Sequence, residues 1–490
     1  MATLFLFILL QLVVLQLPTV SDGEVLTIPM RKARSVVNRS QNLNRVPLSP
    51  TTEEPSTENN LRGKPGQGYY IELSMGAPPQ SVNVLVDTGS SNFAVASAPH
   101  PFIARYFNTD KSSTYINSGI AVDVPYTQGR WDGYLGTDLV ALSAISNVTA
   151  RVNIASITKS ENFFINGSNW EGILGLAYDE IARPDSSLTP FFDSYASQTA
   201  IDDIFTLQLC GSTDKVDSSE LGGTMTVGGL DDTLYSGEVF YTSIIKEWYY
   251  EIIIVDIEVD DISLNLDCKE YNFDKTIVDS GTTNFRVPVK VFDALVHAID
   301  DATPVEVSPE FYTGTELMCW SDDTTPWEHF PSVKISLLAE DSSQSFKLLI
   351  SPKQYMRKVD DGTSEADDCY KFAITTSSSG SVIGAVIMEG FYVIFDRHNK
   401  RIGFAASTCA EREATYVTPQ VMGPYPHNNS TGCAYEVPES NETTLMAVAY
   451  AMASICAICM LPLLVMLFQC YRKGSKEKKY GCDSENLVHQ

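Results

Sequence analysis

Basic residues are scarce in this chain. Its 490 residues include 34 lysine and arginine residues against 61 aspartate and glutamate residues, and the formal net charge is −27. Nucleic-acid-binding proteins present clustered positive charge to the phosphate backbone, so this deficit argues against a nucleic-acid partner. An acidic surface is typical of a secreted protein. It also suits an acidic compartment, because the self-repulsion of the surface weakens as pH falls.

The chain also lacks a pattern of metal ligands. None of its ten cysteines forms a CxxC pair with histidines at zinc-ligand spacing, and Cys456 and Cys459 lie within a long apolar run that does not favour zinc. We expect no metal and no cofactor. Six cysteines precede that apolar run, and an even number on the oxidising side of a membrane predicts three disulfides. Their pairing stays open at this point.

Charge is nearly absent from two stretches. Residues 1–21 are predicted to be a secretory signal peptide, and the alternative, an uncleaved anchor, is disfavoured because a better span lies near the C-terminus. Residues 444–468 carry no charge, and at about 1.5 Å per residue they exceed the about 30 Å hydrocarbon core of a bilayer. A buried core helix is the alternative, but the length and position favour a transmembrane helix. Basic residues such as Arg472 and Lys473 follow it, and this places residues 469–490 in the cytoplasm.

One short pattern occurs twice. Val84-Leu85-Val86-Asp87-Thr88-Gly89-Ser90-Ser91 is closely matched by Thr276-Ile277-Val278-Asp279-Ser280-Gly281-Thr282-Thr283. Each copy predicts a buried strand that ends in an aspartate, a glycine turn, and hydroxyls able to hold the carboxylate. Two such strand ends predict two similar lobes that bring their carboxylates to one cleft. Carboxylates held that close share one proton.

At these residues the chain resembles the pepsin-like aspartic proteases, and most closely the membrane-anchored beta-secretases (memapsins). The resemblance covers roughly residues 60 to 470. The segments that carry it are Asp87–Val95, Val124–Gly129, Phe163–Trp170 and Asp279–Asn284. It implies a mainly β, bilobal fold with a flap hairpin over an interlobe cleft, followed by one transmembrane helix. It implies Asp87 and Asp279 as catalytic residues, with Thr88, Gly89, Ser90, Ser280, Gly281 and Thr282 as their support.

The resemblance also implies a flap and a set of substrate contacts. Val122–Gly129 and the glycines after it predict a hairpin, which without the aspartate pair would be read as an ordinary surface hairpin. In the family this hairpin closes over substrate, with Tyr126 against the bound chain and Trp131 as the partner of its hydroxyl. The implied flap and substrate-binding residues are Tyr126, Thr127, Gln128, Trp131, Phe163, Ile165, Trp170, Ile173, Gly281, Thr283, Asn284 and Arg286.

Two groups of these residues also have an ordinary structural interpretation. Phe163, Ile165, Trp170 and Ile173 would be core residues in most proteins, whereas the resemblance places them in the apolar pocket for the side chain before the cut. Arg286 would ordinarily be solvated surface. Because it follows the second aspartate loop, where pepsins show apolar residues, we expect it to select acidic or polar substrate side chains. The resemblance further implies the disulfides Cys210–Cys409, Cys268–Cys433 and Cys319–Cys369.

The remaining segments complete the expected organisation. Residues 22–45 are basic, and they are interpreted as a pro-segment whose cations cover the carboxylates, although a disordered tail is the plainer alternative. Arg31-Lys32-Ala33-Arg34 fits a furin-type convertase site, and cleavage near Arg45 fits equally well. Residues 46–65 are expected to be flexible, 66–235 and 236–410 to be the two lobes, and 411–443 a luminal stalk. The sequons Asn147, Asn166, Asn429 and Asn441 are predicted glycosylation sites.

Together these features predict a type I single-pass membrane aspartic endopeptidase. Its expected substrates are polypeptides, chiefly type I membrane proteins, and its expected location is the Golgi, endosomes and cell surface with a luminal catalytic part. A soluble pepsin-like enzyme is disfavoured by the uncharged span and by Arg286. An inactive binding module would be expected to lack an aspartate, a glycine or the flap tyrosine, and all are present. A related sheddase with unrelated substrates remains open.

Overall fold

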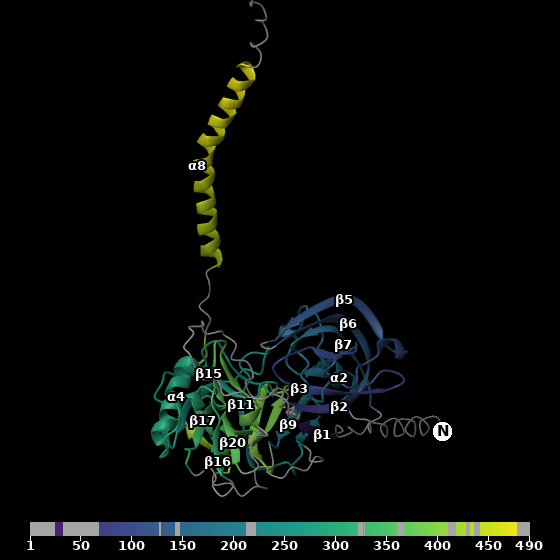
Figure 1. Cartoon of the computed structure of the whole chain (residues 1–490), viewed down its shortest axis with the longest axis vertical. Helices are drawn as coiled ribbons and strands as arrows, with labels where there is room; N and C mark the ends of the chain where they lie inside the picture. Colours follow the sequence, from purple (N-terminus) through teal and green to yellow (C-terminus); the bar gives the residue numbers. More distant parts are fainter. Residues whose placement is uncertain are drawn as a thin grey trace, which may run out of the picture. The chain divides into compact units, whose positions relative to one another are not determined.

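A computed structural model gives the fold of the chain (Figure 1). The residues that it describes are 25–32, 68–126, 129–142, 148–211, 222–321, 327, 329–359, 367–409, 418–427, 432–435 and 442–477. Residues Met1–Tyr435 belong to one compact unit and Glu436–Gln490 to a second. The predicted signal peptide, residues 1–21, and the predicted flexible segment, residues 46–65, lie outside the described residues.

The first unit is built on a 13-stranded sheet that joins strands from both halves of the sequence. In spatial order its strands are β11 (Tyr235–Ser243), β24 (Arg401–Ser407), β23 (Phe391–Asp396), β9 (Ile204–Leu209), β10 (Gly223–Val227), β1 (Leu26–Lys32), β2 (Tyr69–Met75), β3 (Gln80–Asp87), β8 (Gly172–Gly175), β4 (Phe93–Ala96), β7 (Ala150–Glu161), β6 (Arg130–Ala141) and β5 (Ile116–Pro125). Both predicted lobes contribute to it, so the two halves share one core.

Three smaller sheets are built from the second half. The five-stranded sheet contains β13 (Ile262–Ser263), β12 (Ile254–Val259), β17 (Val333–Leu338), β18 (Gln344–Ile350) and β25 (Gln420–Pro426). The four-stranded sheet contains β14 (Thr276–Val278), β22 (Ser381–Ile383), β15 (Phe285–Pro288) and β21 (Ile374–Ser377). The three-stranded sheet contains β16 (Met318–Ser321), β20 (Asp367–Phe372) and β19 (Met356–Val359). The predicted mainly β fold class is confirmed.

Burial explains why the strands form where they do. Along β2, Ile71, Leu73 and Met75 are buried while Glu72 is exposed, which is the alternation of a strand with one face on the core. Val84, Val86 and Val278 are completely buried. Such β-branched residues fit a strand that is covered on both faces.

Few helices accompany the sheets. Besides two short 3-10 turns, η1 (Thr109–Lys111) and η2 (Asp179–Ile181), the helices of the described residues are α2 (Phe191–Thr199), α3 (Cys268–Tyr271), α4 (Val289–Ala302), α5 (Pro309–Tyr312), α6 (Pro352–Tyr355), α7 (Ala385–Met388) and α8 (Glu442–Glu477). Helix α4 follows Pro288 and buries Val291, Leu295 and Ile299 along one face, against β12, β15 and β21. It supports the strand that carries Arg286.

Strand β1 comes from the predicted pro-segment. It lies between β10 and β2, and it buries Ile28 and Met30 in the common core. Arg31 and Lys32 pair in register with Tyr70 and Tyr69. This part of the predicted pro-segment is therefore a core strand, whereas residues 33–45 lie outside the described residues.

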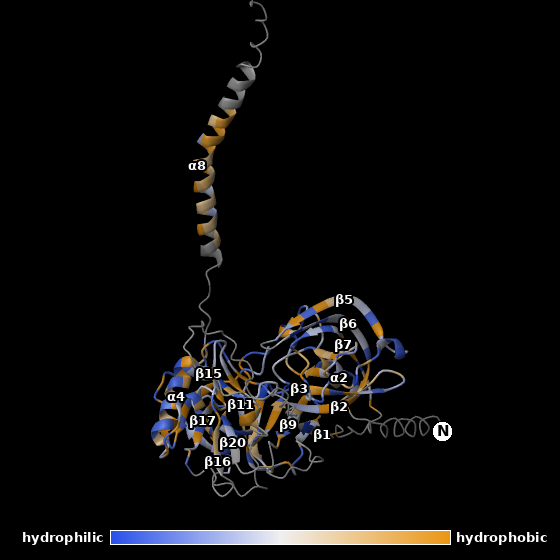
Figure 2. Cartoon of the chain, viewed as in Figure 1, coloured by the Kyte–Doolittle hydropathy of each residue, from blue (hydrophilic) through white to orange (hydrophobic). Residues whose placement is uncertain are grey.

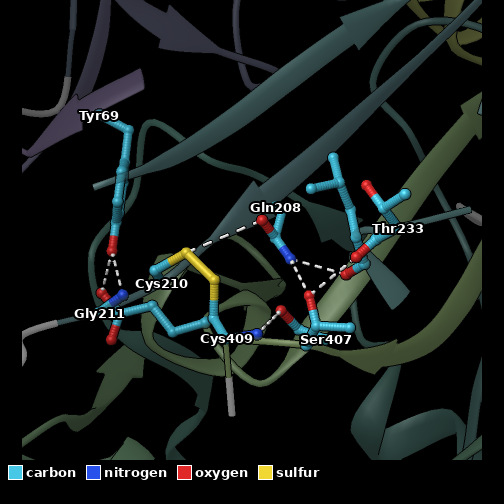
Figure 3. The surroundings of a disulfide bond; sticks show 10 residues. Tyr69, Gln208, Cys210, Gly211, Thr233, Ser407 and Cys409 are labelled. Atoms are coloured by element: carbon cyan, nitrogen blue, oxygen red, sulfur yellow. Dashed lines mark hydrogen bonds between the residues drawn. A yellow bond between two sulfur atoms is a disulfide. The ribbon is translucent and has the colours of Figure 1, made fainter. Parts of the chain in front are cut away.

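Three disulfides tie the first unit. They join Cys210 to Cys409, Cys268 to Cys433 and Cys319 to Cys369, the same pairs that the resemblance implies. Figure 3 shows the first of them beside Gln208 and Ser407, with Tyr69 and Gly211 close by. The Tyr69 hydroxyl accepts a hydrogen bond from Gly211 N at 3.0 Å and donates one to Glu389 at 2.6 Å.

The second unit contains helix α8. Its segment Val448–Phe468 is long and apolar enough to cross a membrane, and Figure 2 colours much of this helix as hydrophobic. The segment agrees with the span predicted at 444–468 and fits a single-pass membrane protein.

Candidate active site

Two equivalent strand ends form the centre of the candidate site. Strand β3 runs parallel to β8 and ends at Asp87, which pairs in register with Gly175. In the second half β14 runs parallel to β22, and Asp279 follows directly, its N–H donating to Ile383 O at 3.0 Å. The repeated pattern therefore folds into the same local structure twice.

The two carboxylates have matching hydrogen bonds. Gly89 N donates to Asp87 Oδ1 and Gly281 N to Asp279 Oδ1, each at 2.8 Å. The Ser90 hydroxyl donates to Asp87 Oδ2 at 2.5 Å, and the Thr282 hydroxyl donates to Asp279 Oδ2 at 2.7 Å. Each carboxylate is thus held at both oxygens by residues within three positions of it, which restricts its rotamer.

Thr88 and Ser280 lock the two loops together. Thr88 N donates to the Ser280 hydroxyl at 3.1 Å, and Ser280 N donates to the Thr88 hydroxyl at 2.9 Å. Each hydroxyl then donates across to the opposite strand, Thr88 to Val278 O and Ser280 to Val86 O. All four bonds are buried, so the relative position of the two aspartates is set by a dry, reciprocal network.

The loops approach so closely that only glycine fits beside the carboxylates. A Cβ atom on Gly89 would lie 2.5 Å from Asp279 Cγ, and a Cβ on Gly281 would overlap Asp87 Oδ1. Behind the loops, a Cβ on Gly175 would lie 2.7 Å from Ser90 O, and Gly384 packs against Thr282 O in the same way. These glycines give the backbones room to bring the carboxylates together.

The electrostatics favour a shared proton. Burial raises the pKa of Asp87 above its usual range, and the charge of Asp279 raises it further, while the bonds from Ser90 and Gly89 oppose this. Asp87 and Asp279 are 5% and 8% exposed. A carboxyl that keeps its proton beside an ionised partner supplies an acid and a base at one place.

The hairpin of β5 and β6 lies beside Asp87. Tyr126 directly follows β5, and its backbone N–H donates to Gly129 O at 3.0 Å across the turn. Burial raises the pKa of the Tyr126 hydroxyl, and the Asp87 charge adds to this. The nearby side chains of Trp131 and Ser90 lower this pKa in turn. The expected hydrogen bond between the Tyr126 hydroxyl and Trp131 Nε1 is not formed, since neither atom has a partner of good geometry among the described residues. Thr127 and Gln128 lie outside the described residues.

The predicted pocket residues gather under this hairpin. The Tyr126 and Phe163 ring centroids are 5.5 Å apart, and Phe163 lies 5.5 Å from Trp170. Ile165 and Ile173 belong to the same apolar cluster. The structure therefore brings all five side chains into one apolar cluster, and Tyr126 connects this cluster to the surroundings of Asp87.

Arg286 belongs to the Asp279 half of the site. It lies in β15 and pairs in register with Val382 of β22. Its guanidinium is half-buried, and burial lowers its pKa while the nearby Asp279 charge opposes this. Along the sequence, Thr283 and Asn284 connect the Asp279 loop to β15, and Thr283 is buried. A cation near the second carboxylate is thus part of the candidate site.

Tyr249 was not predicted from the sequence. Burial raises the pKa of its hydroxyl, and both Asp279 and Asp87 raise it further, which places this half-buried tyrosine near both carboxylates. Its position within the aromatic run Trp248-Tyr249-Tyr250 was the available signal.

The other predicted sites are peripheral or undescribed. Asn166 is exposed next to Ile165, whereas Asn147, Asn429 and Asn441 lie outside the described residues. Within the part of the chain that the structure describes, no group of three or more histidine, cysteine, aspartate or glutamate residues is arranged to hold a metal ion.

Comparison with known proteins agrees with this geometry. Residues 68–407 match the family described as eukaryotic aspartyl protease. The chain is 47% identical over 483 residues to a beta-secretase of Strongylocentrotus purpuratus, covering 92% of this chain and 88% of the relative. It is also 30% identical to cathepsin D of Homo sapiens, over 69% of this chain and 80% of the relative. Cathepsin D of Mus musculus is 29% identical, over 73% and 84%.

Proposed function

The chain belongs to the eukaryotic aspartyl protease family, and we propose that it is a membrane-anchored endopeptidase that cuts the ectodomains of other membrane proteins. The family match and the beta-secretase relative make it an aspartic endopeptidase. The observation that carries the proposal is the pairing of two buried carboxylates, held by matching hydrogen bonds, in a chain that also has an apolar helix long enough to span a membrane.

The proposed chemistry uses one water and one shared proton. The ionised carboxylate of the Asp87–Asp279 pair takes a proton from water, which attacks the carbonyl carbon of the scissile amide. The protonated carboxyl donates to the carbonyl oxygen as it gains charge, and a proton then passes to the leaving amine so that the C–N bond breaks. Ser90 and Thr282 keep both carboxylates in position through this exchange.

Substrate selection is assigned to the two sides of the pair. The cluster of Tyr126, Phe163, Trp170 and Ile173 supports a pocket for an apolar side chain before the cut. The half-buried cation of Arg286 supports a preference for an acidic side chain on the Asp279 side, through charge-assisted hydrogen bonds. Tyr249 lies near both carboxylates and is proposed to contact the bound peptide.

The predicted transmembrane helix and pro-segment bear on where the enzyme acts and how it is processed. A span at Val448–Phe468 restricts cleavage to chains held in the same membrane, which favours type I membrane proteins cut in their stalks. We assign it to the Golgi, endosomes and cell surface with a luminal catalytic unit. Convertase cleavage after Arg34 would separate β1 from the rest of the chain. Because Ile28 and Met30 are buried, loss of that strand would open the sheet between β10 and β2.

The test is peptide cleavage by residues 22–435, from which the span is removed, across pH 3.5 to 7, beside Asp279→Asn. We expect cleavage at mildly acidic pH after apolar residues, and loss of at least about a thousandfold in the variant. Folded protein with its pro-segment removed and its disulfides intact that cuts no peptide at any pH would overturn the protease assignment and favour a binding module. A second arm compares the full chain with its span-free form on a membrane-anchored substrate. Equal cleavage by both would refute the role of the anchor.

A further inference from the structure

A buried cation supports the Asp87 loop from behind. Arg397 follows β23 and its side chain is 2% exposed. Its Nη2 lies 2.6 Å from Asp193 Oδ1 in the first turn of α2, and its Nε lies 3.2 Å from Asp203 Oδ1 before β9. Burying a guanidinium is costly unless it is paired, and both pairs join segments far apart in the chain.

The guanidinium also lies over two aromatic rings. Its central carbon is 4.7 Å from the centroid of Tyr178 and 5.3 Å from that of Phe192. A planar cation over an aromatic face is attracted by the ring's electron density, most strongly where water is excluded. Arg397 is therefore in direct contact with the Tyr178 ring.

Tyr178 is next to the backbone that carries Asp87. The Ser91 hydroxyl donates to Tyr178 O at 2.5 Å, and Ala177 N donates to Ser90 O at 2.9 Å. Leu176 N donates to Asp87 O, also at 2.9 Å. Three consecutive residues ending at Tyr178 thus hold the loop that includes Asp87, Ser90 and Ser91.

The same support reaches the second strand end through Tyr250. The Tyr250 ring centroid is 5.2 Å from that of Tyr178, and its hydroxyl donates to Leu176 O at 2.5 Å. Tyr250 O accepts from Val278 N at 3.1 Å, one residue before Asp279. Tyr178 therefore contacts the supports of both carboxylates.

We propose that Arg397 is a positioning residue for catalysis, which acts through Tyr178 to hold the Asp87 loop at the distance from Asp279 that proton sharing requires. The inference rests on the proposed function, since it assigns a role in the same reaction. The residue touches neither carboxylate, and its effect on them passes through the backbone at 176–178 and the Ser91 hydroxyl.

The chain contains a matched control in Arg401, four residues later. Its guanidinium carbon lies 4.0 Å from the Tyr241 centroid, and it pairs with Asp396 at 2.8 Å and Glu340 at 3.0 Å. Like Arg397, it combines one tyrosine face with two carboxylates. Tyr241 lies in β11 and pairs in register with Gly403 of β24, at the edge of the sheet away from β3.

The experiment measures peptide hydrolysis by the full chain in detergent micelles for Arg397→Met, Arg397→Lys and Arg401→Met. Arg397→Met is expected to lower kcat at least about tenfold with KM within about twofold, because the loss falls on the geometry of the transition state. Arg397→Lys, which keeps the charge but not the planar contact, should recover part of the loss. Arg401→Met should change kcat by less than about twofold. Its Tm should fall as the Tm of Arg397→Met does, because each substitution removes an arginine from two carboxylates and a tyrosine ring.

Affinity for a peptide with a hydroxyl in place of the scissile carbonyl gives a second readout. It should fall in Arg397→Met by the same factor as kcat/KM, since such a ligand reports the carboxylate geometry. A double-mutant cycle with Tyr178→Leu should show that the two losses in kcat are not additive, because both act on one support. If Arg397→Met does not fold, Arg397→Lys and Tyr178→Leu carry the same comparison.

Two outcomes would overturn the inference. One is an unchanged kcat in folded Arg397 variants, and the other is an equal loss of kcat in Arg401→Met, which would indicate a general structural role. Both require that the wild-type chain cuts peptide. A wild-type chain without hydrolysis would refute the proposed function itself, so the two failures are distinguishable.

Discussion

The loops that carry Asp87 and Asp279 have the same hydrogen bonds and different surroundings. In both, a glycine N–H and a hydroxyl three residues on hold the two carboxylate oxygens. The Asp87 loop lies beside Tyr126 and an apolar cluster, and is backed by Tyr178. The Asp279 loop lies near the cation of Arg286. The repeated motif thus sets the geometry of the carboxylates, while neighbours outside the motif make the two sides chemically unequal.

The largest effect is expected from a substitution at Gly281, which is the counterpart of Gly89 in the Asp279 loop. Gly281→Ala should reduce kcat/KM by at least about a thousandfold, because its Cβ would overlap Asp87 and force the two loops apart. The measurement is steady-state hydrolysis beside Tm.

Gly237→Ala is the control for this change. Gly237 has a φ of 79° with open space around it, so the substitution strains the backbone without touching the site. We expect it to lower Tm and leave kcat/KM within about threefold. A Gly281→Ala variant that retains wild-type kcat/KM would contradict the close approach of the loops.

A smaller loss is expected from changes in the β5–β6 hairpin, which lies on the Asp87 side. Tyr126→Ala should reduce kcat/KM by about a hundredfold, because it removes the ring that packs on Phe163. Tyr126→Phe should cost less than about tenfold, since the hydroxyl has no hydrogen bond of good geometry with the described residues. Equal losses in the two variants would assign the role to the hydroxyl instead of the ring.

The smallest effect is expected on the Asp279 side, in selectivity. Arg286→Ala should lower the preference for peptides with an acidic side chain over their amide counterparts by about tenfold, with little change for the amide peptides. Competition between paired peptides measures the ratio directly. Arg401→Ala, another partly exposed arginine, is the control. An unchanged ratio in Arg286→Ala would return that residue to the class of solvated surface arginines.

Local features of the site were predictable from the sequence, and distant contacts were not. The bonds at Asp87 and Asp279 come from residues within three positions, so the motif itself predicts them. Tyr249 and Arg397 reach the site only through tertiary packing. The aromatic run at 248–250 draws attention to Tyr249 without placing it near the carboxylates, and no local pattern marks Arg397.

The predicted pro-segment, residues 22–45, likewise makes a contact that the local sequence does not predict. A basic segment at 22–45 indicated a removable cover, but the pairing of β1 with β10 depends on a partner almost 200 residues away. The alternation of Ile28 and Met30 is compatible with a strand, yet it does not say which sheet receives it.

The central claim is that Asp87 and Asp279 share a proton, and the pH dependence of stability tests it most directly. A carboxyl whose pKa is raised by folding keeps its proton in the native state at pH values where the unfolded chain has lost it. The contribution of this carboxyl to native stability therefore falls as pH rises from about 4 toward that raised pKa, by at most about 1.4 kcal/mol per pH unit.

The measurement is the free energy of urea unfolding of residues 22–435 from pH 4 to 7, for the wild type and Asp87→Asn. Because the variant has no proton to share, its stability relative to the wild type should increase steadily over this interval. Parallel pH profiles for the two proteins would mean that Asp87 ionises as an ordinary carboxyl, and this would contradict the account of the site.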